Sequence, residues 1–120
     1  MPVGHKLYVV AWCWLAGGSL TTSGLYLSAM DYIGATTNAN KTLANSGLNA
    51  SWQKRSVIVT VSAGYSGIRI VCGRASAQTA DYYLDSVVAA KLNNKVPGSV
   101  LSLSDADLKA WCDARYPNFF

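Results

Sequence analysis

The amino-acid sequence predicts one α+β domain over residues 1–120, with an antiparallel sheet followed by two C-terminal helices packed on it. Up to residue 74, apolar residues recur mostly at the period of a strand, and glycine-rich turns separate the runs. After residue 79 they recur at the period of a helix, with capping residues at the ends. This order, strands first and helices last, is typical of α+β proteins. The length suits one domain.

The first predicted strand covers residues 6–15 and is apolar on both faces, so we expect it to be covered on both sides. One face presents large rings, which makes it a candidate interface; core packing and a stacking surface for bases are the alternatives. These rings belong to Tyr8, Trp12 and Trp14. A short targeting segment is the alternative interpretation of the same apolar run.

The next two segments give weaker signals. Residues 21–33 are predicted to form a second strand, paired with the first in an N-terminal hairpin across Gly17-Gly18. A helix is the alternative, because Leu25, Ala29 and Tyr32 also fit helical spacing. Residues 34–51 show no apolar period, so a long loop is predicted there.

A central hairpin gives the clearest strand pattern. Val57, Val59 and Val61 alternate with Ile58 and Thr60, and the run Ile68–Cys72 repeats such an alternation after a glycine-containing turn at 63–67. We expect the two strands to pair. With the N-terminal hairpin they make a sheet of about four or more strands.

A first helix is predicted over residues 79–92. Thr79 is a candidate N-cap, and the apolar stripe is Leu84, Val87, Val88 and Leu92. The run Val96-Pro97-Gly98 ends this helix, and a short strand at 99–103 is a further alternative.

A second helix is predicted to begin after Ser104, with Asp107 three residues later in a variant of the capping box. Leu103 and Leu108 are spaced as a hydrophobic staple across this N-terminus. The residues expected to face inward are Leu108, Trp111 and Cys112.

The charge distribution is uneven. The chain has no Glu, its net charge is +4, and no acid lies between Asp31 and Asp81. That window predicts an anion-facing sheet surface, and ordinary solvated bases are the alternative. The candidate nucleic-acid-binding residues are Lys54, Arg55, Arg69 and Arg74.

The residues of common catalytic and metal sites are sparse. His5 is the single histidine, and Cys13, Cys72 and Cys112 follow no zinc or redox spacing. We expect buried free thiols, with an intersubunit disulfide as the alternative. No phosphate-binding glycine motif occurs. The sequence therefore predicts a protein that is not an enzyme and has no metal or cofactor.

These observations predict a self-assembling structural protein, in the form of a dimer or a larger homo-oligomer. Two helices would cover one face of the sheet and leave the other face, or an edge, for a second copy. The low charge offers little repulsion against that pairing. RNA or another polyanion is a candidate partner, and no membrane span is expected. The alternative function is a small accessory binder of nucleic acid, nucleotide or protein.

The run 52–61, the strand at 68–71 and the helix start at 104–108 resemble the central hairpin and helix of single-stranded RNA phage coat proteins. The resemblance implies a virion coat subunit whose sheet binds RNA and whose helices hold a dimer partner. Lys54 and Arg69 would then face RNA, in the virion or in the cytoplasm of a host cell. In that family one more long strand falls between residues 74 and 103, where the periodicity here predicts a helix.

Overall fold

A computed structural model describes residues 2–18, 25–33, 36–42, 50–74 and 80–116 of the chain. Within these ranges the chain forms strands followed by two helices, in an α+β arrangement. The strands are β1 (Lys6–Gly18), β2 (Leu25–Ile33), β3 (Thr36–Thr42), β4 (Gln53–Thr60), β5 (Gly67–Arg74) and β6 (Ala80–Lys91). The helices are α1 (Gly98–Leu101) and α2 (Asp105–Asp113).

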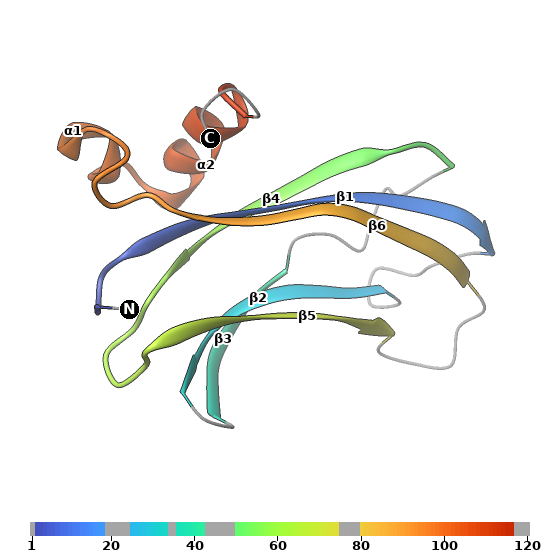
Figure 1. Ribbon diagram of the computed structural model, residues 1–120, viewed down its shortest axis with the longest axis horizontal. Helices are drawn as coiled ribbons and strands as arrows, with labels where there is room; N and C mark the ends of the chain where they lie inside the picture. The colour runs from blue at the N-terminus through green and yellow to red at the C-terminus, as the bar shows by residue number, and fades with distance from the viewer. Residues whose placement is uncertain (1, 19–24, 34–35, 43–49, 75–79, 117–120) are drawn as a thin grey trace.

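The described strands form two antiparallel sheets of three strands each. The helix-side sheet has the order β4-β1-β6, and the outer sheet has the order β3-β2-β5. Figure 1 shows the two sheets stacked, with α1 and α2 on the face of the helix-side sheet that points away from the outer sheet. The helix-side sheet is therefore the middle layer of three.

The central strand β1 is packed on both of its faces, as the sequence predicts. Towards the outer sheet it buries Leu7, Val9 and Cys13, against a cluster that includes Val59 of β4 and Ile68 of β5. Towards the helices it buries Tyr8 and Val10, in a cluster completed by Ile58, Leu92, Leu108 and Cys112. The face expected to need a second copy is thus covered by the outer sheet of the same chain.

The two predicted hairpins are wrong, although their strands exist. β1 pairs with β4 and β6, whereas β2 pairs with β3 and β5. The turn after β4 carries Gly64 at φ +86° and leads across to the outer sheet. Alternating apolar residues around a glycine turn are compatible with a hairpin within one sheet and with a crossing to a second sheet. In both arrangements the same face of each strand is buried. The link from Thr60 to Gly67 is also longer than the two residues of a tight hairpin.

The predicted helix at 79–92 is wrong, because its described part is strand β6. Two features of β6 obscure the alternation of apolar and polar residues that is expected of a strand. Both faces of β6 pack, since it belongs to the middle layer: Leu84 contacts the cluster between the sheets, and Val88 contacts the cluster under the helices. A bulge between Asp85 and Val88 also shifts the alternation by one residue. The resulting spacing of apolar residues imitates a helix. Thr79 lies outside the described residues.

The predicted loop at 34–51 contains strand β3, which pairs with β2. Its sequence, TTNANKT, has only one small apolar residue, Ala39, so no apolar alternation marks a buried face. Of the two alternatives for residues 21–33, strand and helix, the strand is confirmed over Leu25–Ile33, where β2 lies. Residues 21–24 and 43–49 lie outside the described part.

The second predicted helix is confirmed as α2, with Ser104 as its N-cap accepting a hydrogen bond from the Asp107 N–H at 3.2 Å. Leu108 and Cys112 are buried, and Trp111 is half-buried at the edge of the same cluster. The alternative strand at 99–103 is wrong, since α1 occupies Gly98–Leu101. Cys13 and Cys112 are buried thiols outside any disulfide, as expected, and the side chain of Cys72 lies outside the described part.

Candidate interaction surface

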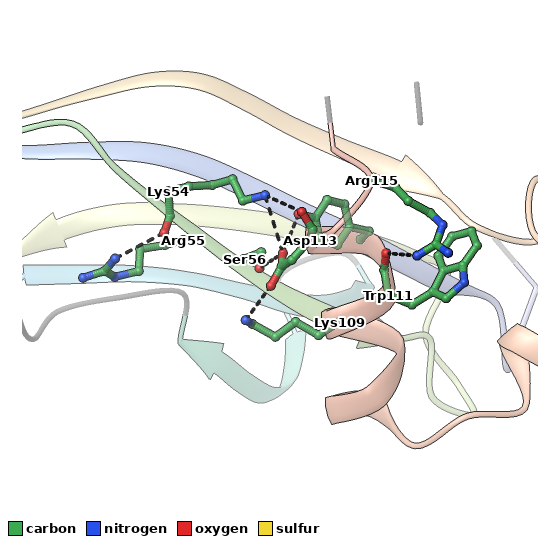
Figure 2. A network of polar contacts seen from close by, with 8 residues as sticks. Lys54, Arg55, Ser56, Lys109, Trp111, Asp113 and Arg115 are labelled. Atoms are coloured by element: carbon green, nitrogen blue, oxygen red, sulfur yellow. Dashed lines mark hydrogen bonds and ion pairs between the residues drawn. The ribbon is translucent and has the colours of Figure 1, made fainter. Parts of the chain in front are cut away.

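The helix α2 lies over one end of the helix-side sheet and is fastened there by Asp113, its last residue. The Asp113 carboxylate accepts hydrogen bonds from Ser56 Oγ at 2.5 Å, Tyr8 Oη at 2.6 Å and Lys109 Nζ at 2.8 Å. Figure 2 shows the Ser56 and Lys109 contacts converging on this carboxylate. We call Asp113, Tyr8, Ser56 and Lys109 the Asp113 cluster. It joins α2 to both β1 and β4.

The titration of the Asp113 cluster reflects this geometry. Partial burial alone would raise the pKa of Asp113, but hydrogen bonds from Lys109, Ser56 and Tyr8 outweigh burial and hold the pKa below its usual value. Burial and the neighbouring carboxylate raise the pKa of Tyr8 far above its usual value, so the phenol stays protonated and donates. Burial also raises the pKa of the Cys112 thiol to about 11. The cluster is thus a structural contact held by one ionised carboxylate.

Of the four predicted nucleic-acid-binding residues, Lys54 is engaged within the chain. Its Nζ donates to the Asp113 carbonyl oxygen at 3.2 Å and lies 3.9 Å from the carboxylate (Figure 2). The same ammonium lies 5.1 Å from the ring centroid of Tyr116. The side chain keeps 22% of its exposure, so little of its charge is presented to solvent.

The structure does not gather the other three predicted basic residues beside Lys54. Arg55 is the next residue of β4 and so projects from the opposite face, where its Nη1 donates to the Lys54 carbonyl oxygen at 3.2 Å. Arg69 is exposed but belongs to β5 in the outer sheet. Arg74 ends β5, and its side chain lies outside the described part.

The predicted interface residues divide at the edge of α2. Tyr8 is fully buried beneath the helix. Trp12 and Trp14 follow on the same face of β1, by alternation, and are only half-buried. Figure 1 shows that the described helices lie over the end of the sheet where β1 begins. Trp12 and Trp14 come later in β1 than Tyr8, so they lie towards the other end, which the described helices leave uncovered.

Two further aromatic residues join Trp12 and Trp14 on this uncovered end. Tyr83 of β6 is the register partner of Trp14 and is 57% exposed. Trp52, just before β4, meets the Trp14 ring edge-on with 5.4 Å between centroids and is 42% exposed. Trp12, Trp14, Trp52 and Tyr83 are named the aromatic patch.

The charge beside the aromatic patch is balanced. Trp12 pairs in register with Lys54 on one side and with Asp85 on the other. Lys54 is held by the Asp113 cluster, while Asp85 is exposed. Among the described residues, the two register neighbours of Trp12 thus carry one positive and one negative charge.

Sequence reasoning missed Trp52 and Tyr83 for separate reasons. Trp52 precedes the first paired residue of its strand, so alternation alone does not assign it a face. The sequence pattern predicts a helix around Tyr83, and only the register of β6 against β1 places this residue beside Trp14. A strand assignment for 80–91, based on its tyrosine and valine pairs, would have been the available signal.

Metal and membrane signals are also absent from the described residues. No group of three or more His, Cys, Asp or Glu side chains there is placed to hold a metal ion. In the same part of the chain, neither helix has the length and hydropathy needed to cross a bilayer.

Comparison with known proteins returns no match among family models, curated proteins or solved structures. The geometry of this chain, above all the aromatic patch, is therefore the guide to its function.

Proposed function

We propose that the protein is a non-enzymatic, self-assembling structural subunit whose copies associate through the aromatic patch. The observation that carries this proposal is the exposure of Trp52 and Tyr83, next to the half-buried Trp12 and Trp14, on a sheet end that α2 leaves uncovered. Monomeric proteins seldom expose contiguous apolar patches, and aromatic residues are enriched at the centres of protein interfaces. A second copy would supply the missing cover.

The composition supports this choice of partner. The chain carries only 13% charged residues, has no Glu and has a net charge of +4. Two copies therefore meet with little long-range repulsion, and the balanced charge at Lys54 and Asp85 adds none locally. The same balance gives an anionic partner no net charge attraction beside Trp12.

A virion coat subunit is the specific form of this proposal. The resemblance to single-stranded RNA phage coat proteins implies one more long strand between residues 74 and 103, and β6 lies there. The same resemblance implies an N-terminal hairpin, whereas β1 and β2 belong to different sheets. The coat assignment therefore depends on assembly experiments.

The test compares two pairs of substitutions by sedimentation velocity at matched concentrations. Trp52→Ser with Tyr83→Ser removes the two most exposed rings of the aromatic patch, which should weaken association at least tenfold because buried aromatic residues dominate interface energies. Val3→Ser with Leu103→Ser is the matched control, since both side chains are exposed and neither is in the aromatic patch. Equal association of both double variants would count against the proposal.

A second candidate is an accessory RNA binder that forms no shell, favoured by the exposure of Arg69 within the acid-free window of 32–80. Arg69→Ala should then reduce the slope of log affinity against log salt by about 0.7–0.9, the share of one phosphate contact on single strands or duplexes. Lys54→Ala should change that slope less, because its ammonium is engaged by Asp113. Absence of salt-dependent binding to RNA in about 50 mM salt would remove this candidate.

A further inference from the structure

Strand β6 contains a bulge in the middle of its pairing with β1. Val10 pairs with Val88 and Trp12 with Asp85, so Ser86 and Val87 together oppose the single residue Ala11. Ser86 has φ +52°, the left-handed conformation found at the first position of a glycine-type bulge. Asp85 Oδ1 accepts a hydrogen bond from the Ser86 N–H at 2.8 Å, which supports this backbone.

The bulge lies on the exposed edge of the helix-side sheet. Among the described residues β6 pairs on one side only, and most of its residues are exposed, including Val87 at 46%. The opposite edge strand, β4, is less exposed, since its residues are all buried or half-buried, with Ile58 and Val59 each only 2% exposed. An exposed edge offers unpaired N–H and C=O groups to a strand from another molecule.

Two further features of the sheet edges also hinder pairing with a strand from another molecule. Asp81, Asp85 and Lys91 place charges along β6, which discourage a neighbouring strand. In the outer sheet, the edge strand β3 also has one extra residue, because Met30 pairs with Asn40 and Tyr32 with Thr37. Both edges therefore interrupt the regular ladder that an added strand would follow.

We propose that the Ser86 bulge prevents the β6 edge from pairing with a strand of another copy, so that self-association is confined to the aromatic patch and closes at a finite size. The confinement to the aromatic patch rests on the proposed function, whereas the blocking of the edge does not. Without the bulge, the regular β6 edge would permit open-ended addition of strands, as in fibrils.

Deletion of Ser86 tests this inference cleanly. It would place Val87 opposite Ala11 and leave Asp85 opposite Trp12, so the remaining residues keep their faces. We expect the deletion variant to grow with concentration into large assemblies that bind thioflavin T, with a weight-average mass several times that of the wild type. Ser86→Gly is the control, because glycine retains the bulge.

A proline on the same edge identifies the surface through which growth occurs. The Leu92 N–H bonds to the Lys6 carbonyl on the β1 side, so alternation directs the N–H of Ala89 outward. Ala89→Pro removes that outward donor and should return the deletion variant to the size of the wild type. Growth that persists with the proline would overturn the inference.

The remaining outcomes separate this inference from the proposed function. A deletion variant with wild-type urea stability and wild-type size would overturn the role of the bulge. Growth of the deletion variant from a monomeric wild type would support the blocked edge and contradict the proposed self-association. If the deletion variant does not fold, the double variant Asp81→Thr with Lys91→Thr tests whether the bulge alone blocks the edge. This pair keeps the bulge and removes edge charge, so an unchanged size supports the bulge and growth overturns it.

Discussion

Asp113 is the residue on which the attachment of α2 to the sheet depends. Its carboxylate receives donors from α2 itself, from β1 and from β4, through Lys109, Tyr8 and Ser56. Hydrogen bonds to an ionised group are stronger than those between neutral groups. Removal of the charge would leave the phenol of Tyr8, which is fully buried, with a weaker acceptor.

Substitution of Asp113 by Asn should lower the free energy of unfolding by about 1–3 kcal/mol at pH 7. The effect should depend on pH. Because the pKa of Asp113 is lower in the folded state than its usual 3.8, the stabilisation is complete above that value and is lost as pH falls through the folded-state pKa. Urea melts from pH 7 to pH 2 should therefore show the two proteins converging in acid.

The matched control for this series is Asp107→Asn. Asp107 is exposed in the first turn of α2, so its removal changes the net charge by the same amount without touching the sheet. It should cost less than 1 kcal/mol at any pH, as is usual for an exposed charge near a helix N-terminus. A difference between wild type and Asp113→Asn that stays constant down to pH 2 would contradict the role given to the ionised carboxylate.

Among the helices and strands, α2 could be predicted from a local pattern, whereas the pairing of the strands could not. Ser104 and Asp107 are three residues apart, so a capping pattern is visible without knowledge of the rest of the chain. The choice between a hairpin and a crossing to a second sheet depends on contacts such as Val59 with Ile68, which lie across the inter-sheet gap. Alternation alone is the same in both arrangements.

The candidate site shows the same division. Trp12 and Trp14 could be assigned to one face from alternation along β1, which is a local property. Their position relative to α2, which buries Tyr8 and leaves the tryptophans at the uncovered end, depends on where the helix docks. The basic window predicted one charged face, but Lys54 and Arg55 point to opposite faces and Arg69 belongs to the other sheet.

The packing of α2 predicts unequal effects of two truncations on its inner side. Leu108 is fully buried in the cluster beneath the helix, so Leu108→Ala should cost about 2–5 kcal/mol in the free energy of unfolding. Trp111 is half-buried, and Arg115 lies over its ring at 4.0 Å. Trp111→Ala should therefore cost less, about 1–2 kcal/mol. Denaturant melts that reverse this order would show that the inner face of α2 is misassigned.

At the scale of the whole molecule, three layers leave one end of the middle sheet without a covering helix among the described elements (Figure 1). On the side of β1 that faces the outer sheet, Leu7, Val9, Ala11 and Cys13 are buried, so an incomplete core there is not the reason to expect a second copy. The reason is the aromatic patch, where Trp52 and Tyr83 are exposed beside Trp14. We therefore propose that the whole molecule associates with other copies through this patch.

The native mass of the wild-type protein tests that claim most directly. Light scattering coupled to size exclusion, from low to high micromolar concentration, should give a mass of at least twice the 12.8 kDa of one chain. The Trp52→Ser/Tyr83→Ser variant should elute at 12.8 kDa over the same range. A wild-type mass that stays at 12.8 kDa at every concentration would contradict self-association through the aromatic patch.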